Sequence, residues 1–109
     1  SQLSSSIHMT QPWFHSGLTR DETHALFAKQ GMVDGMFLIR ESQRIPGAFV
    51  LSFSHNQKVK HYQINMVEDG VYTIDDGGTR FTDLIQLVEF YQLNSGGLPT
   101  RLLHICTKL

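Results

Sequence analysis

Arg40 and Ser42 are the pair of side chains in this sequence best suited to binding an anion. They follow the apolar run 36–39, which predicts a buried central strand. Because side chains alternate along a strand, Arg40 and Ser42 point to the same side of the sheet. A guanidinium group beside a hydroxyl can donate several hydrogen bonds to a planar or tetrahedral anion. The alternative from these residues alone is a structural arginine paired with an internal aspartate or glutamate.

A second arginine, Arg20, lies at the start of a predicted helix. Thr19 and Glu22 have the spacing of a capping box, in which each side chain bonds to the backbone of the other residue. The helix is expected to continue through Phe27 and to end near Gly31. A cation in the first turn is unfavourable for the helix, but an anion bound there would reverse that penalty. The alternative for Arg20 is a solvated surface side chain.

Strands and a second helix account for most of the remaining sequence. Runs of apolar residues between turn signals predict strands at 36–42, 48–54, 58–64 and 71–74, the first three forming an antiparallel meander. After a loop at 75–78, Thr82 is expected to cap a helix with the core-facing stripe Leu84, Leu87, Val88 and Tyr91. The expected fold is α+β, a central antiparallel sheet flanked by one helix on each face.

The length and composition are those of one globular domain, expected over 13–109 and preceded by a flexible, serine-rich linker over 1–12. A net charge of −1 provides no overall field to attract nucleic acid or an acidic membrane. The one cysteine, Cys106, excludes an internal disulfide and fits a reducing compartment. No apolar run reaches membrane-spanning length, and no signal peptide is visible, so no membrane insertion is expected.

The order of these motifs resembles a Src-homology-2 (SH2) domain, the phosphotyrosine-binding module, from Trp13 to the end of the chain. The segments that carry the resemblance are Trp13-Phe14-His15, Thr19-Arg20-Asp21-Glu22, the Phe-Leu-Ile-Arg-Glu-Ser run at 37–42, Lys60-His61-Tyr62 and Phe81-Thr82-Asp83-Leu84. Within the family the sequence resembles most the growth-factor-receptor-bound adaptors that carry Ras-associating and pleckstrin-homology domains. That narrower resemblance is carried by the segments 33–35, 57–61, 75–77, 79–90 and 92–94.

The resemblance implies a cytoplasmic signalling adaptor that binds phosphotyrosine peptides, without enzymatic activity or a cofactor. Its partners would be activated receptor tyrosine kinases or their substrates, as in insulin receptor signalling. The residues that match the family's phosphate pocket are Arg40, Arg20, Ser42, Gln43, Arg44, Ser52 and His61. Physical reasoning agrees, because phosphotyrosine carries nearly two negative charges and three strong acceptor oxygens. A phosphoserine is disfavoured, since only a long aromatic stem reaches an arginine set deep at a strand end.

Residues after the phosphotyrosine are expected to cross the strand that carries Tyr62. The expected surface, between the loops at 75–78 and 94–97, comprises Tyr62, Gln63, Ile64, Ile74, Tyr91 and Leu98. Gln63 stands where many family members carry a lysine that packs on the phenol ring, so ring recognition is expected to depend more on Arg20. The resemblance also implies a preference for asparagine two residues after the phosphotyrosine. The alternative for Tyr62 and Tyr91 is a role in the core.

The family resemblance also implies a weak homodimer through Phe90. This residue lies off the apolar stripe of the second predicted helix, so its ring is expected to face solvent. An exposed apolar ring is a candidate interface, although single exposed aromatics are common on protein surfaces.

Two other kinds of function fit the sequence less well. Cys106 follows His104 closely, but the glycine-rich anion cradle and downstream arginine of a cysteine phosphatase are missing. The six histidines lack paired ligand spacing, and no second cysteine completes a zinc site.

Binding of single-stranded nucleic acid is the second alternative. Bases could stack on aromatic residues beside Lys58, Lys60 and Arg44, but the net charge and the missing RNP-type pattern argue against it.

Overall fold

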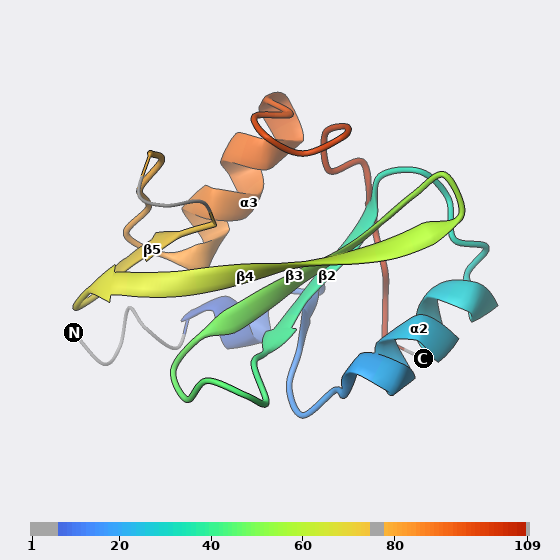
Figure 1. Ribbon diagram of the computed structural model, residues 1–109, viewed down its shortest axis with the longest axis horizontal. Coiled ribbons are helices and arrows are strands. Elements are labelled where there is room, and N and C mark those ends of the chain that lie inside the picture. The colour runs from blue at the N-terminus through green and yellow to red at the C-terminus, as the bar shows by residue number, and fades with distance from the viewer. Residues whose placement is uncertain (1–6, 75–77, 109) are drawn as a thin grey trace.

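A six-stranded sheet lies between two helices in the computed structural model, which describes residues 7–74 and 78–108 (Figure 1). The elements in chain order are η1 (Ile7–Thr10), β1 (Phe14–His15), α2 (Arg20–Lys29), β2 (Met36–Glu41), β3 (Phe49–His55), β4 (Lys58–Glu68), β5 (Val71–Thr73), α3 (Leu84–Leu93) and β6 (His104–Ile105). The expected loop at 75–78 and the expected linker at 1–12 fall partly outside the described residues.

The sheet follows the order β1-β2-β3-β4-β5, and β6 also pairs with β2. The predicted antiparallel meander of β2, β3 and β4 is confirmed. The two short strands, β1 and β6, instead run parallel to β2. Neither was predicted as a parallel partner, because two residues are too few to show a period. The central strand β2 therefore pairs with a strand from the start of the domain, β1, and with one from its end, β6.

Each face of the sheet is covered by one helix, as predicted (Figure 1). The face under α3 holds the larger core, to which β2 contributes Phe37 and Ile39. The face under α2 holds a smaller apolar cluster of Phe27, Met36, Leu38 and Cys106. Because side chains alternate along β2, the position after Met36 and Leu38 on the α2 face is Arg40. The smaller cluster therefore ends at a guanidinium group.

The helix starts are set by side-chain caps. At α2 the predicted capping box is present: Thr19 Oγ1 accepts from the Glu22 amide at 3.0 Å, and Glu22 Oε1 accepts from the Thr19 amide at 2.9 Å. At α3 the expectation of a Thr82 cap is wrong. Asp83 Oδ1 accepts from the Gln86 amide at 2.8 Å, and the Thr82 hydroxyl donates to Gln86 Oε1 at 2.8 Å. A carboxylate one residue later reaches the first-turn amide, so the cap moves to Asp83.

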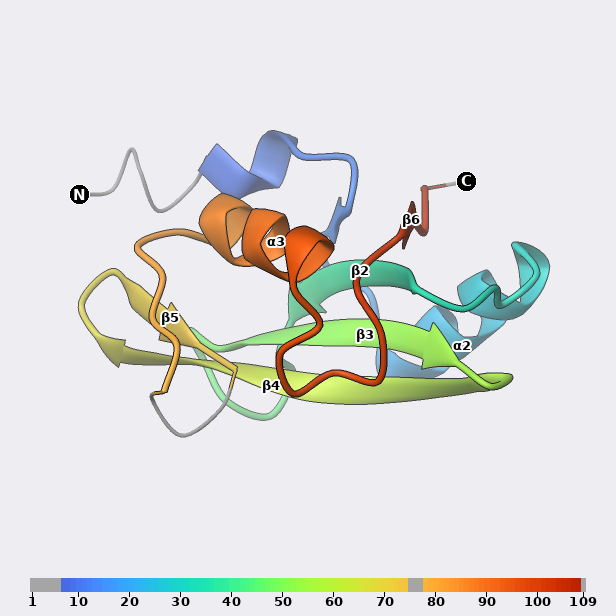
Figure 2. The same cartoon turned by 90° about the horizontal axis from the view of Figure 1, so that it is seen from above.

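Part of the described segment before β1 packs on the domain. Residues 7–10 form the short helix η1, which lies on the same side of the sheet as α3 (Figure 2). The His8 ring is buried, with its centroid 4.7 Å from that of Phe14 and 5.1 Å from that of Phe49. The second half of the expected 1–12 linker therefore contributes to the fold.

Cys106 closes the smaller core beside α2. Its side chain is completely buried, and its carbonyl oxygen accepts a hydrogen bond from His15 Nε2 at 2.8 Å. Burial raises the pKa of the Cys106 thiol to about 11. The thiol is therefore a neutral packing group at physiological pH.

Candidate functional site

A pocket of about 330 Å³ opens on the α2 face of the sheet, where the first turn of α2 meets the end of β2. Its lining comprises Arg20, Arg40, Ser42, Gln43, Arg44, Val50, His61 and Gln63. Six of the seven residues predicted to bind phosphate therefore come together. Ser52, the seventh, lies beneath them and bonds to Arg40 and His61. Gln63 also lines this pocket, although it was predicted for the peptide surface.

Arg40 is the buried centre of the pocket, with 5% of its surface exposed. Its Nε donates to Ser52 Oγ at 3.3 Å, and its Nη2 donates to His61 Nδ1 at 3.3 Å. Desolvation, with a smaller contribution from the charge of Arg20, lowers the pKa of Arg40. Within residues 7–74 and 78–108, no carboxylate forms a salt bridge with this guanidinium group. The alternative of a structural arginine paired with an internal acid is therefore not what the structure shows.

His61 connects the pocket floor to α2. Its Nδ1 lies 2.9 Å from Ser52 Oγ, and its Nε2 lies 3.0 Å from Nε2 of His24. Desolvation and the neighbouring charges of Arg20 and Arg40 lower the pKa of His61 to about 4. The ring is therefore neutral near pH 7. The family resemblance selected His61 as a pocket residue, but the sequence gave no reason to select His24.

The loop after β2 is closed by Ser42. Its Oγ accepts hydrogen bonds from the amides of Arg44 at 3.2 Å and Ile45 at 3.1 Å. These two amides are thus bonded to the serine in this structure. The hydroxyl hydrogen of Ser42 remains available for donation, because its oxygen is the acceptor in both bonds. The loop presents the exposed side chains of Gln43 and Arg44 at the pocket rim.

The acid next to Arg40 in the chain is held outside the pocket. Glu41 Oε1 accepts from the Gly17 amide at 3.0 Å and from Ser16 Oγ at 3.3 Å. Strand alternation directs Glu41 and Arg40 to opposite sides. The pocket therefore gathers three guanidinium groups and neutral donors with no carboxylate in its lining, an arrangement suited to a doubly charged anion.

The predicted peptide surface is only partly exposed. Tyr62 and Ile74 are half-buried and Gln63 is exposed. The other three predicted residues are buried in the larger core, with exposures of 0% for Ile64, 4% for Tyr91 and 6% for Leu98. Their burial differs from the expectation for these residues: Ile64 shares a strand face with Tyr62 but belongs to the larger core, and Tyr91 belongs to the inward stripe of α3. The alternative of a core role is correct for Tyr91.

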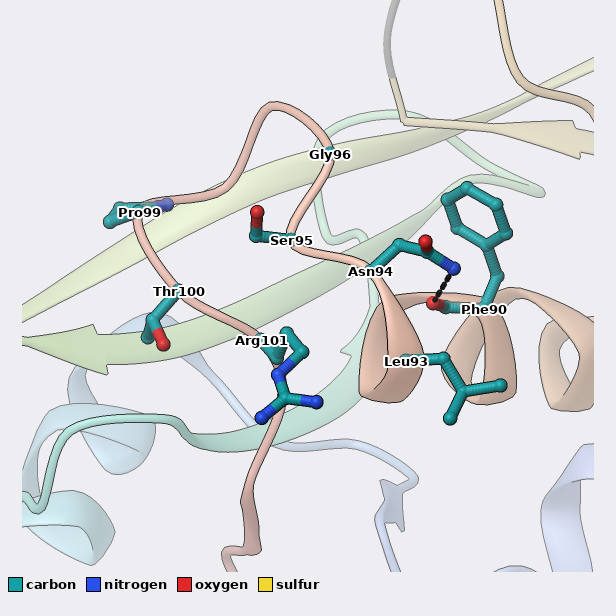
Figure 3. A pocket seen from close by; sticks show the side chains of 8 residues that line it. All are labelled: Phe90, Leu93, Asn94, Ser95, Gly96, Pro99, Thr100 and Arg101. Carbon is teal, nitrogen blue, oxygen red and sulfur yellow. Dashed lines mark hydrogen bonds between the residues drawn. The ribbon is translucent and has the colours of Figure 1, made fainter.

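Phe90 lies beside an open hollow at the C-terminal end of α3 (Figure 3). Its ring is half-buried and packs 5.4 Å from the ring of Phe81 and 5.0 Å from that of Tyr91, centroid to centroid. Leu93, at the same end of the helix, is 74% exposed. Figure 3 shows these two side chains projecting in different directions from the last turn. The expected solvent-facing ring is thus partly covered, and the more exposed apolar group is Leu93.

A model of the SH2 domain family matches residues 13–91 of this chain. The chain belongs to the SH2 domain family. The family binds phosphotyrosine and its domains are binding modules, so this SH2 domain is not an enzyme. In the described part of the chain there is no helix long and apolar enough to cross a membrane, and there is no group of three potential metal ligands.

Curated relatives resemble the SH2 domain over nearly its whole length. It is 59% identical to human Growth factor receptor-bound protein 14 over 107 residues, which is 95% of this chain and 20% of the relative. It is 52% identical to mouse Growth factor receptor-bound protein 10 over 112 residues, which is all of this chain and 18% of the relative. The Caenorhabditis elegans tyrosine-protein kinase csk-1 is 44% identical over 84% of this chain. The SH2 domain thus spans about a fifth of the adaptor-like relatives.

Proposed function

We propose that this SH2 domain serves a cytoplasmic signalling adaptor, which it recruits to activated, tyrosine-phosphorylated receptors or their substrates. Insulin receptor signalling is the pathway we expect. The similarity to proteins named growth factor receptor-bound supports a receptor-linked role. The phosphate would be bound by the pocket residues Arg40, Arg20, Ser42, Gln43, Arg44, Ser52 and His61.

The burial of Arg40 is the observation that carries this proposal. Burial of a charged group that is 95% removed from solvent is costly unless an opposite charge is supplied, and the neighbours of Arg40 within the described residues are neutral or cationic. A phosphate dianion supplies that charge and accepts the remaining guanidinium donors. The depth of Arg40 favours phosphotyrosine over phosphoserine, because the phenol ring spans the distance from the rim to the floor.

The rest of the peptide would run from the pocket across β4. Gln63 at the pocket and Tyr62 on the other face of the same strand are accessible for such contacts, and Ile74 lies beyond them next to β5. We propose a preference for asparagine two residues after the phosphotyrosine. Ile64, Tyr91 and Leu98 would support this surface from the core instead of contacting the peptide.

The test compares three peptides of one sequence, containing phosphotyrosine, tyrosine or phosphoserine, by isothermal titration calorimetry. Only the phosphotyrosine peptide is expected to bind measurably, because the other two leave Arg40 without its counter-charge. Replacement of the asparagine two residues further on by alanine is expected to weaken binding. Equal affinity for the tyrosine and phosphotyrosine peptides would exclude the proposal.

A weak homodimer is the second part of the proposal, with the surface of α3 around Phe90 as its interface. Phe90 and the exposed Leu93 provide apolar area at one end of the helix. This surface and the Arg40 pocket lie on opposite faces of the sheet, so pairing would leave the pocket open.

A further inference from the structure

We propose that His24 is a positioning residue for phosphotyrosine binding: it accepts the Nε2 proton of His61 and so keeps Nδ1 of His61 as an acceptor for Arg40 and Ser52. His24 does not line the pocket. It completes a chain of hydrogen-bonded groups that runs from Arg40 through Ser52 and His61 to α2. The inference rests on the proposed function for its effect on affinity, but its effect on His61 can be measured without any ligand.

The direction of each hydrogen bond follows from Arg40. A guanidinium group only donates, so Ser52 Oγ accepts from Nε and His61 Nδ1 accepts from Nη2. The Ser52 hydroxyl, with its oxygen already an acceptor, can then donate its own hydrogen to His61 Nδ1 at 2.9 Å. Nδ1 of His61 must therefore carry a lone pair, and a neutral ring then has its proton on Nε2.

This assignment determines the role of His24. The Nε2 atoms of His61 and His24 are 3.0 Å apart, so exactly one proton can lie between them. Because His61 supplies it, His24 must accept it and must be neutral with its own proton on Nδ1. The helix position makes this contact possible: His24 lies one turn after Arg20, so one face of α2 reaches both the pocket and His61.

Loss of the acceptor would disturb Arg40 through His61. Without His24, the tautomer of His61 with its proton on Nδ1 becomes accessible. That proton would face the Arg40 Nη2 hydrogen, so the arginine would lose an acceptor. The cationic groups around His61, which are Arg20 and Arg40, also disfavour a doubly protonated ring, and this supports a choice between neutral tautomers.

The first measurement is the tautomer of His61 in the free domain, by long-range proton–nitrogen NMR correlation. We expect the proton on Nε2 of His61 and on Nδ1 of His24. Observation of a Nδ1 proton on His61 in the wild-type domain would overturn the inference without any variant. The result does not depend on peptide binding, so it separates this inference from the proposed function.

The second measurement uses three variants with the phosphotyrosine peptide. His24→Leu removes the acceptor and is expected to weaken binding about three- to tenfold, the scale of one hydrogen bond, with both His61 tautomers populated. His24→Gln places an amide oxygen at similar reach and is expected to restore both the affinity and the tautomer. His104→Leu, which changes an exposed histidine outside the pocket, is the matched control and is expected to bind as the wild type.

Each outcome decides the question. A weaker His24→Leu variant whose His61 tautomer is unchanged would mean that His24 is merely structural, and failure of His24→Gln to restore affinity would mean the same. If His24→Leu does not fold, the comparison of His24→Gln with His24→Ala replaces it. A wild-type domain that has the expected tautomer but binds no phosphotyrosine peptide would refute the proposed function and leave the His24 assignment standing.

Discussion

Neutral side chains orient the buried guanidinium group of Arg40. Ser52 and His61 satisfy two of its donors, but neither offsets its charge. Such a site binds an anion with little competition from internal acids. Because a buried charge without a counter-charge is costly, an anion that binds to Arg40 is expected to stabilise the folded domain.

The first prediction concerns Arg40→Lys. Lysine cannot reproduce the two-pronged guanidinium geometry, so phosphotyrosine-peptide affinity is expected to fall by at least about 2 kcal/mol. Arg20→Ala is expected to cost less, because Arg20 is exposed to solvent. Titration calorimetry measures both, and thermal unfolding of each variant checks that the domain is folded. Wild-type affinity in a folded Arg40→Lys variant would show that Arg40 is structural.

At the residue scale, most of the candidate site follows from sequence. Strand alternation predicted that Arg40 and Ser42 share a side, and the capping box located Arg20 at a helix start. His24 was not predicted, because a histidine in mid-helix has no pattern that distinguishes a hydrogen-bond partner from a surface residue. Its significance depends on the distance between α2 and β4, which only the folded structure provides.

The two helices of this domain begin with different capping arrangements. At α2 the cap and the third helical residue bond to each other, as their spacing predicts. At α3 the two bonds involve different residues. Asp83 accepts from the Gln86 amide and so caps the helix, while the side chain of Gln86 accepts from Thr82 instead of from Asp83. The sequence Thr-Asp contains two good capping residues, and the choice between them depends on the backbone direction at the helix entry, which the local sequence does not specify.

The second prediction tests this cap. Asp83→Ala is expected to lower the free energy of unfolding by about 1 kcal/mol, because the Gln86 amide loses its acceptor at the positive end of the helix dipole. Thr82→Ala, the matched neighbour, is expected to cost less. Urea unfolding followed by circular dichroism provides the midpoints. A larger loss of unfolding free energy in Thr82→Ala than in Asp83→Ala would show that Thr82 is the capping residue.

At the scale of elements, the meander and both helices were predictable, whereas β1, η1 and the parallel pairing of β6 with β2 were not. The long strands carry their own alternating pattern. The short ones exist because β2 offers a free edge and because the aromatic residues Phe14 and Phe49 accept the His8 ring. Burial of Ile64 and Leu98 likewise depends on packing within the larger core, which is a property of the assembled layers.

The whole molecule separates its two proposed interaction surfaces. The Arg40 pocket is on the α2 face, and Phe90 is on α3. Figure 1 shows these two helices on opposite sides of the sheet. A domain that is built in this way can bind a peptide and a second copy independently. Changes at one surface are therefore expected to leave the other unaffected.

The third prediction is that the domain self-associates weakly through α3. Sedimentation velocity at high concentration is expected to show a dimer for the wild type and a monomer for Phe90→Arg. Since Phe90 also packs on Phe81, Leu93→Arg is a useful second variant that adds charge to the same end of α3 at a 74% exposed position. Phosphotyrosine-peptide affinity is expected to be unchanged in both. Indistinguishable monomeric profiles for the wild type and Phe90→Arg would exclude the dimer.

The buried position of Cys106 makes this domain convenient for site-specific labelling. Alkylating reagents and maleimide dyes attack the thiolate, and a completely buried thiol whose pKa is about 11 has almost none at neutral pH. A second cysteine introduced at an exposed position is therefore expected to take up a fluorophore alone, without removal of the native one. Brief maleimide treatment of the folded wild-type domain, followed by mass spectrometry, is expected to show an unmodified protein, and the same treatment in denaturant is expected to add one label.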